Sequence, residues 1–317
     1  MLRLIRRRLL SLLPTILIGT LIVFMLQQLV PGGPAAALLG GDMTREAVEA
    51  TNERLGLNRP LPVQYGAWLR DVLSGDLGVS FRSQEPVSRF ILQRLAPTLE
   101  LVVAALLVAV LAGGTLGIWA AVRREHRDGR AILALTGIGL SVPNFWLGTL
   151  VVGYFGVHLA VVPVGGFVPL SAGLWPSLHS VLAPTLVMAI ISTVMIARHL
   201  RSSMTLVLES THVRTARAAG LHPRDINLNY ALRIAVAPLI TFLPLVFSQL
   251  VGSTVVIERI FNIPGLGSGL VQAVNNRDYP TIQGVILVIL LAVIVLNLLA
   301  DLALQALDPR IRQAQRR

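Results

Sequence analysis

Six long apolar runs alternate with polar stretches along this chain of 317 residues. Each run has at least the roughly 20 residues that an α-helix needs to cross the hydrocarbon core of a bilayer. The runs lie at Leu9–Val30, Thr98–Val122, Ala131–His158, Leu178–Ala197, Ile234–Ile257 and Ile282–Ala303. This pattern predicts an all-α membrane protein with six transmembrane helices.

A longer polar segment, residues 31–97, separates the first two apolar runs. It opens with the turn sequence PGGP, and three stretches with helical patterns follow at Thr44–Gly56, Arg59–Gly78 and Glu85–Leu95. The first stretch has a capping residue at its start and a glycine at its end. We expect a small helical segment between the first two spans, which divides the chain into residues 1–30, 31–97 and 98–317.

The second of these stretches carries an apolar stripe at helical spacing: Tyr65, Trp68, Leu69 and Val72. Such a stripe predicts a helix that packs on a neighbouring part of the chain. A surface for a partner that delivers substrate is compatible with this interpretation.

Arginines orient the predicted spans. The chain has a formal net charge of +11, and all 27 basic residues are arginine. Four arginines precede the first run, four lie in 123–130, six in 198–233 and four in the C-terminal tail. The segment 31–95 instead balances seven arginines with seven acids. Because positive loops stay in the cytoplasm, both termini are predicted to be cytoplasmic. Arginines divided among short loops do not indicate nucleic-acid binding.

Residues that are missing exclude several chemistries. Without cysteine, neither a disulfide nor a thiolate metal site is available. Without lysine, the chain cannot form a Walker A phosphate loop, so any ATP that drives it binds to another chain. The six histidines are scattered and are interpreted as interfacial side chains, and no motif of a hydrolytic or metal-dependent enzyme is present. We therefore expect no catalytic, cofactor or metal site in this chain.

Glycine, proline and sparse charge characterise the predicted spans. Gly113 and Gly117 form a small-xxx-small face suited to close helix packing. Prolines in the third, fourth and fifth spans predict kinks. The carboxylates Glu100 and Asp301 lie near span ends, and ion-coupled carriers usually need such groups at the midplane. The stretch PGLGSG at Pro264–Gly269 predicts a tight turn.

A short basic stretch, THVRTARAAGLHPRD (Thr211–Asp225), interrupts the apolar sequence between the fourth and fifth runs. Propensities favour a helix over Leu208–Ala219. Gly220 suits the left-handed position after a helix, Leu221 its hydrophobic contact, and Pro223 the first position of a second helix.

On the first of these two helices Arg214 and Arg217 share a face. Val213, Ala216 and Ala219 predict a small-residue surface that a partner can approach. Composition alone also permits an amphipathic helix whose arginines meet lipid phosphates.

These residues resemble the cytoplasmic coupling motif of binding-protein-dependent ABC importer permeases. The family pattern is Glu-Ala-Ala, three residues, Gly, nine residues and Ile-x-Leu-Pro. Gly220 stands at the family's glycine and Ala216 at its second alanine, while Arg214 replaces the glutamate and Thr215 the first alanine.

The end of the motif is partly preserved, because Leu232 matches whereas Tyr230 and Arg233 replace the isoleucine and the proline. The variant VRTARAAG is similar to that of the peptide and nickel branch. Further stretches that resemble this branch are RPLPVQYGAWL, GDLGVSFRS, PTLEL, SVPNFWLG, VVIERIFNIPGLGSGLVQAVNNRDYPTIQG and LDPRIR. The resemblance therefore extends over nearly the whole chain.

The resemblance implies a type I importer permease in the bacterial cytoplasmic membrane. It implies a second homologous permease, two ATPase subunits or domains that bind Mg-ATP, and an extracytoplasmic substrate-binding protein. That protein would dock on 31–95, 159–177 and 258–281. The coupling helix would lie at 209–226, with the ATPase contacted by Arg214, Thr215, Ala216, Arg217, Ala219, Gly220 and Leu221.

The substrate is predicted less sharply. Di- and oligopeptides are favoured, and nickel, glutathione or another small solute remain alternatives. Polar residues of the spans that would line a pathway are Ser141, Asn144, Ser248, Gln249 and Asn297. An ion-coupled carrier acting alone and a membrane scaffold without transport are the competing classes.

Overall fold

A computed structural model describes residues 2–29, 35, 39, 44–163 and 165–307. The predicted PGGP turn and the terminal LDPRIR stretch fall largely outside these residues. The described chain is helical, apart from an isolated β-bridge between Val79 and Pro86. The chain divides into two units, residues 1–96 with 268–294 and residues 97–267 with 295–317.

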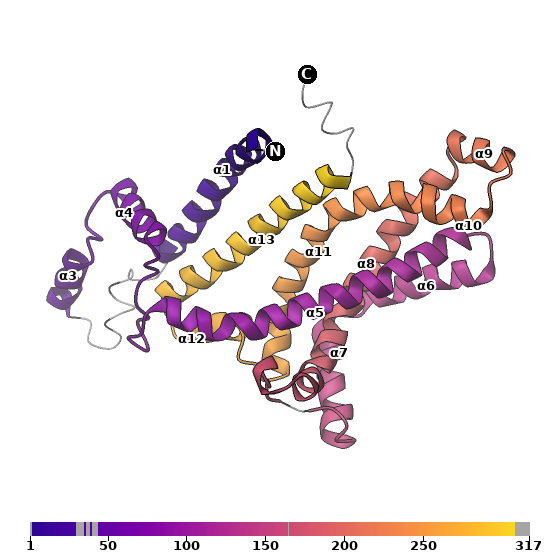
Figure 1. Ribbon diagram of the computed structural model, residues 1–317. Helices are drawn as coiled ribbons and strands as arrows, with labels where there is room; N and C mark the ends of the chain where they lie inside the picture. Colours follow the sequence, from indigo (N-terminus) through magenta and orange to yellow (C-terminus); the bar gives the residue numbers. More distant parts are fainter. Residues whose placement is uncertain (1, 30–34, 36–38, 40–43, 164, 308–317) are drawn as a thin grey trace. The chain divides into compact units, whose positions relative to one another are not determined.

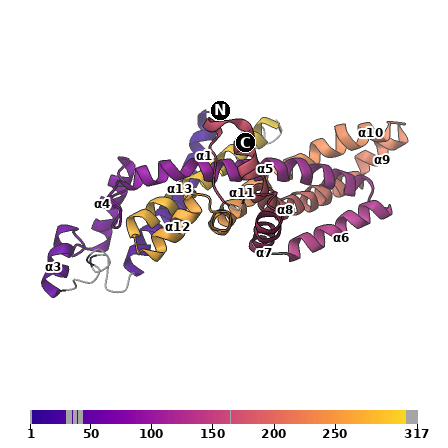
Figure 2. The same cartoon turned by 90° about the horizontal axis from the view of Figure 1, so that it is seen from below.

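The helices appear in Figures 1 and 2, coloured along the sequence. Their bounds are α1 Leu2–Met25, η1 Leu26–Leu29, α3 Arg45–Arg54, α4 Leu61–Leu73, α5 Val87–Val122, α6 Arg127–Ser141, α7 Asn144–Leu150, η2 Val151–His158, η3 Leu170–Ala172, α8 Leu174–Leu208, α9 Thr211–Ala218, α10 Pro223–Asp225, η4 Ile226–Leu232, α11 Arg233–Ile260, α12 Leu266–Asn275 and α13 Tyr279–Leu307.

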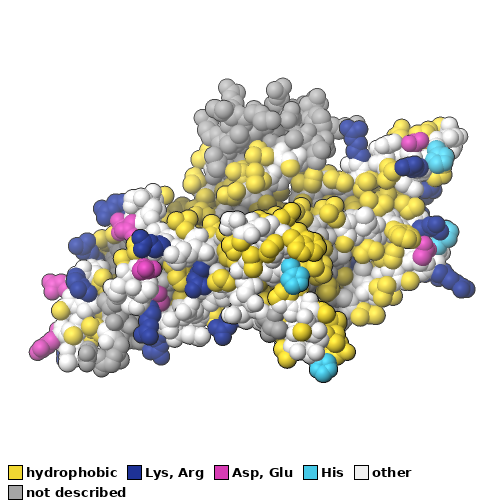
Figure 3. Space-filling view, turned by 60° about the horizontal axis from the view of Figure 1, so that its bottom comes forward, with side chains coloured by type: hydrophobic (Ala, Val, Ile, Leu, Met, Phe, Trp, Pro, Cys, Tyr) yellow, Lys and Arg dark blue, Asp and Glu magenta, His cyan; other side chains and the backbone are white. Residues whose placement is uncertain are grey.

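Four described helices are long and apolar enough to cross a membrane: Val87–Val122, Leu174–Leu208, Pro223–Ile260 and Tyr279–Leu304. The third predicted span supplies a fifth only if a bent pair of helices counts as one span. Leu12–Gln28 is a shorter apolar helix. The described residues thus give four or five candidate spans, and the sixth stays a prediction. Figure 3 shows broad areas of hydrophobic side chains, as expected for surfaces that face lipid.

The predicted span Ala131–His158 bends by 86° between α6 and α7. Val142 and Pro143 both have extended backbone at this point, with ψ of 118° and 136°. Proline disfavours helical geometry at the residue before it, so a helix tends to end there. The expected kink at Pro143 is therefore a break. In contrast, α8 continues through Pro184, and α11 continues through Pro238 and Pro244.

In the first unit, α3 and α4 occupy the first two predicted helical stretches. The Thr44 side chain accepts a hydrogen bond from the backbone of Ala47, which caps α3 as predicted. Two residues of the predicted stripe pack on α1, because the rings of Tyr65 and Trp68 lie 5.5 and 5.9 Å from the ring of Phe24. The third predicted stretch is not a separate helix, since α5 runs without a break from Val87 into the predicted second span.

In the second unit, α8 packs against α5, α6 and α11 (Figures 1 and 2). The glycine face predicted on α5 contacts α8 closely. A Cβ added at Gly113 would lie 2.6 Å from the Thr193 carbonyl oxygen, and one at Gly117 would lie 2.8 Å from that of Ala197. Because the close neighbours are backbone atoms, only glycine fits without moving one of the helices. This confirms the prediction of close packing.

Candidate functional site

The basic stretch Thr211–Asp225 forms a short helix, a turn and a second helix in the second unit. α8 ends at Leu208, Ser210 adopts an extended conformation with ψ of 156°, and α9 begins at Thr211. The Ser210 hydroxyl donates to the carbonyl oxygen of Val207 at 2.5 Å instead of capping α9. The helix predicted over Leu208–Ala219 is thus shorter, because the chain turns a corner at its first two residues.

The turn after α9 is a Schellman motif. Gly220 has φ of +80°, in the left-handed region. Its N–H donates to the carbonyl oxygen of Arg217 at 3.0 Å, and the N–H of Leu221 donates to that of Ala216 at 3.2 Å. These two bonds satisfy carbonyl groups that the end of a helix leaves free. The left-handed glycine predicted at this turn is confirmed, and the hydrophobic contact of Leu221 stays a prediction.

The chain leaves the turn directly into a long helix. Pro223 occupies the first position of α10, as predicted, and the Nδ1 atom of His222 accepts the N–H of Arg224 at 3.2 Å. α10 continues through the π-helical η4 into α11, so that Pro223–Ile260 forms one span of 38 residues. π-Helical turns are rare and occur frequently at functional sites. The turn is therefore joined to a candidate span without an intervening loop.

The faces of α9 differ from the prediction. Val213 is fully buried and Ala216 is 9% exposed, so both pack inside this chain. They do not form the free small-residue surface that the sequence suggested, because α9 uses them to contact its own unit. Of the seven predicted coupling residues, the exposed ones are Arg214, Thr215, Arg217, Ala219 and Gly220, while Leu221 is half-buried.

A hollow of about 520 Å³ lies beside the turn, lined by residues of α9, η4 and the loop after α5. Arg217 and Leu221 contribute to its wall. Next to it, Arg124 approaches the Glu209 carboxylate to 3.4 Å, which joins the end of α5 to the corner between α8 and α9. The Arg124 side chain is 23% exposed and that of Glu209 is 56% exposed. The corner is therefore fixed by a polar contact as well as by the buried face of α9.

The predicted pathway residues lie on several helices of the second unit. Ser141 and Ser248 donate to carbonyl groups of their own helices, those of Gly137 at 3.1 Å and Pro244 at 2.9 Å. The side-chain oxygen of Asn144 is buried at the start of α7, and Asn297 is exposed on α13. The two serines are thus engaged within their helices.

Gln249 has a different role, because its Oε1 atom accepts the Ser192 hydroxyl at 2.9 Å and so joins α11 to α8. Ser192 is fully buried. Ser192 was not among the predicted residues, because it is one of four hydroxyl residues in the apolar run Leu178–Ala197 and nothing local distinguishes it.

Glu258 is a second residue that sequence analysis missed. It lies one position beyond the predicted fifth span and is fully buried. Its carboxylate accepts the Thr98 hydroxyl at 2.6 Å, and the same Thr98 oxygen accepts the N–H of Leu266 at 2.8 Å. A buried carboxylate normally requires such partners. These bonds hold the start of α12, so the stretch predicted as a tight turn ends at Gly265 and becomes helix from Leu266.

The chain was compared with protein families. The family model described as binding-protein-dependent transport system inner membrane component matches residues 113–313. A second model, for the N-terminal part of the membrane component of such systems, matches residues 1–102.

Similar curated proteins span nearly the same length. A probable peptide ABC transporter permease protein of Sinorhizobium fredii is 37% identical over 308 residues, which cover 97% of this chain and 98% of the relative. The glutathione transport system permease protein GsiC of Salmonella typhimurium is 39% identical over 312 residues, covering 98% and 99%. Among solved structures, a chain of the MetNI methionine ABC transporter in an inward-facing conformation matches with a TM-score of 0.56. It is 17% identical, and the match covers 69% of this chain and 96% of that one. This likeness shows the fold.

Proposed function

The chain belongs to the binding-protein-dependent family of ABC importer permeases, in its peptide and nickel branch, and we propose that it forms half of the translocation pathway of an ATP-driven importer of di- and oligopeptides. It is a multi-pass protein of the inner membrane. The finer parts of the proposal are its topology, the coupling element, its partners and the substrate.

The proposed topology has six spans with both termini in the cytoplasm. It is supported by the arginine-rich loops 123–130 and 198–233 and by the balanced charge of 31–95. Residues 31–97 then form the extracytoplasmic segment, and residues 98–317 form the permease core.

α9 is the proposed coupling helix, seated in a groove of an ATPase subunit. The observation that carries this proposal is the rigid connection from α9 through the Schellman turn into the span Pro223–Ile260. Exposed Arg214 and Arg217 would pair with acids or carbonyl groups of the ATPase, while Thr215, Ala219 and Gly220 allow close approach. Ala216, being inward, and half-buried Leu221 would act by holding the turn.

The proposed complex contains a second homologous permease, two ATPase subunits that bind Mg-ATP and an extracytoplasmic binding protein. No cofactor is assigned to this chain. Relatives named peptide permeases favour a peptide substrate, and relatives named glutathione permeases favour a peptide with a γ-linkage, so glutathione is the second candidate and nickel the third. Ser141, Asn144, Ser248, Gln249 and Asn297 remain the proposed pathway residues, of which Gln249 also joins two helices.

A pair of glycine variants tests the coupling element. Gly220 and Gly75 both have positive φ, +80° and +86°, and neither has an atom within 4 Å of an added Cβ. Valine at either site meets the same backbone penalty of about 1–3 kcal/mol. In reconstituted complexes, Gly220→Val is expected to lower peptide uptake per ATP hydrolysed by about tenfold. Gly75→Val should change it by less than about twofold, and equal effects would contradict the proposal.

A second measurement is cysteine cross-linking, and because the chain has no cysteine, an introduced thiol is its only one. Thr215→Cys introduces a single thiol on the exposed face of α9 and is expected to cross-link to the ATPase subunit, whereas Ser202→Cys on the preceding helix α8 is not. Uptake that responds to an uncoupler instead of ATP depletion would support the ion-coupled carrier. A normal α9 cross-link without any uptake would support the scaffold.

A further inference from the structure

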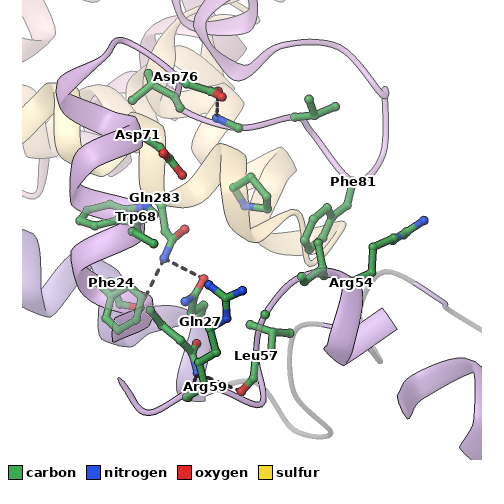
Figure 4. A pocket seen from close by; sticks show the side chains of 18 of the residues that line it. Phe24, Gln27, Arg54, Leu57, Arg59, Trp68, Asp71, Asp76, Phe81 and Gln283 are labelled. Atoms are coloured by element: carbon green, nitrogen blue, oxygen red, sulfur yellow. Dashed lines mark hydrogen bonds between the residues drawn. The ribbon is translucent and has the colours of Figure 1, made fainter. Parts of the chain in front are cut away.

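A cavity of about 510 Å³, lined by apolar and polar side chains, lies within the first unit (Figure 4). Its walls come from the end of α1, the end of α3, the chain between α3 and α4, α4 itself, the loop 76–84 and the start of α13. Residues from these walls include Phe24, Gln27, Trp68, Phe81, Pro280 and Gln283. Cavities of about 300–1,000 Å³ are typical of small-molecule sites.

Opposite charges stand at the two ends of this cavity. Arg54 ends α3 and Arg59 lies just before α4, whereas Asp71 lies in the last turns of α4 and Asp76 follows it. Figure 4 shows the two aspartates on one side and both Arg54 and Arg59 apart from them. From Leu61 to Asp71 the helix rises by about 15 Å. The cavity therefore presents two arginines and a pair of carboxylates to one elongated ligand.

The walls between these charges are held in place by hydrogen bonds. The Gln283 amide donates to the carbonyl oxygens of Val23 and Phe24, both at 3.3 Å, and to the Gln27 side chain at 3.4 Å. The Gln64 amide donates to the carbonyl oxygen of Arg59 at 2.8 Å, which fixes the backbone below the arginine.

Aromatic rings complete the wall, with the ring of Trp68 at 5.9 Å from that of Phe24. The site thus offers apolar surface to side chains and a fixed frame for the charged groups. Preorganised walls of this kind reduce the ordering that binding requires.

We propose that this cavity binds a short zwitterionic peptide, with its carboxylate toward Arg59 and its ammonium toward Asp71 and Asp76. The arginine and aspartate side chains reach inward, which leaves room for about two to four extended residues at about 3.3–3.6 Å each. A single inorganic ion would satisfy only one end of the cavity. The choice of peptide rests on the proposed importer function, but the charge geometry stands by itself.

Binding at this site is expected to be weak. Asp71 already pairs with Arg70 at 3.3 Å, and their side chains are 51% and 80% exposed. A partly exposed charge pair contributes a factor of only about two to fivefold. A dissociation constant in the millimolar range suits a holding site that releases peptide into the transporter.

The experiment measures binding of L-alanyl-L-alanyl-L-alanine to the complex in nanodiscs, without binding protein or ATP, by calorimetry. The N-acetyl peptide and the peptide amide each lack one terminal charge. Arg59→Gln should weaken binding of the free peptide about fivefold and leave that of the amide unchanged. Asp71→Asn should weaken binding of the free peptide by a similar factor and leave that of the N-acetyl form unchanged.

Two further variants sharpen the test. Arg70→Gln frees Asp71 from its neighbour and should strengthen binding of the free peptide about twofold. Arg45→Gln is the matched control, because Arg45 lies on α3 outside the cavity and pairs with Glu49 at 3.0 Å; it should change nothing. Arg45, Arg59 and Arg70 are exposed and Asp71 is half-buried. The melting temperature of each variant complex should equal that of the unchanged complex, which checks that the variant is folded and assembled.

The outcomes separate this site from the transport function. Equal binding of all three peptide forms, or no binding up to about 10 mM, would overturn the inference even if peptide uptake is normal. If the complex binds the peptide with the expected charge selectivity but imports no peptide, the inferred binding site stands and the proposal that peptides are the imported substrate is wrong. Variants that weaken docking of the binding protein while peptide binding persists unchanged would make this cavity a protein contact and would also overturn the inference.

Discussion

The contacts inside the first unit differ from those inside the second. In the first unit, a few buried polar side chains join segments far apart in the sequence. Asp278 is 5% exposed and accepts three bonds, from the Ser80 hydroxyl at 2.6 Å, the Phe81 N–H at 2.9 Å and the Thr281 hydroxyl at 2.7 Å.

The second unit also has buried polar bonds, those of Thr98 with Glu258 and of Ser192 with Gln249, but its helices in addition approach closely at small residues, as α5 and α8 do at Gly113 and Gly117. In lipid, apolar surface gives no net drive for helix association, so close packing has to supply it. In the first unit, a substitution that leaves a buried donor or acceptor of such a bond without a partner costs about 1–3 kcal/mol. The difference predicts that volume changes harm the second unit most and that changes of hydrogen-bonding capacity harm the first unit most.

The largest effect is expected from added volume between α5 and α8. Gly113→Ala places a methyl group 2.6 Å from a backbone oxygen and 2.9 Å from the Cβ of Ile196, so the helices must separate. We expect a loss of about 2–3 kcal/mol in the free energy of unfolding. The measurement is denaturant unfolding in detergent.

Gly114 is the matched control, because it is next in sequence and has no atom within 4 Å of an added Cβ. Gly114→Ala should be neutral or should stabilise by up to about 1 kcal/mol, the helix propensity of alanine over glycine. Equal destabilisation by both variants would contradict the assignment of close packing to Gly113.

An intermediate effect is expected at Asp278 in the first unit. Asp278→Asn replaces one acceptor oxygen with a donor, so at least one of three donors loses its partner at nearly constant volume. The expected loss is about 1–3 kcal/mol. Hydrogen exchange should then increase at Phe81 and in the loop 76–84, while exchange in α8 remains unchanged.

Asp76→Asn provides the comparison, since Asp76 is exposed and accepts only the N–H of Gly78, at 2.8 Å. Its amide oxygen can still accept that bond, so exchange should change little. If Asp76→Asn loosens the loop as much as Asp278→Asn does, then the buried carboxylate is not what holds it.

The smallest effect is expected from a partly exposed polar contact of the second unit, between Arg124 and Glu209. Both side chains are partly exposed, so their interaction should contribute about 0.5 kcal/mol and should fall at high salt. A double-mutant cycle with Arg124→Ala and Glu209→Ala measures it through the unfolding free energy. A coupling above about 2 kcal/mol would show that this partly exposed contact matters as much as the buried bonds of Asp278 do in the first unit.

Local features of the fold were predictable from the sequence. The cap at Thr44, the glycine face of α5 and the turn at Gly220 depend on residues close together in the chain or on backbone sterics, and the structure contains all three. The break at Pro143 was predictable in position, but its angle of 86° depends on what the two halves pack against.

Features that depend on tertiary packing escaped prediction. Spacing placed Val213 and Ala216 on one face of α9, but it did not reveal that this face turns inward. Glu258 was assigned to a loop because a predicted span ends where the first charged residue interrupts the apolar run. Its burial depends on Thr98, a hydrogen-bond partner 160 residues away that local sequence does not reveal. The cavity beside α4 likewise combines α1 with α13, which no local pattern connects.

The prolines of α11 have a mechanical consequence. Pro238 and Pro244 each remove one backbone hydrogen bond, and both lie in the part of α11 nearer to the turn at Gly220. The hydroxyls of Thr241 and Ser248 donate to the carbonyl groups of these prolines, at 2.8 and 2.9 Å. The remaining 16 residues, Leu245–Ile260, contain no proline and extend for about 24 Å. The first part of α11 should therefore bend more easily than Leu245–Ile260. A small tilt imposed at α9 can then become a larger sideways movement at the far end of the helix.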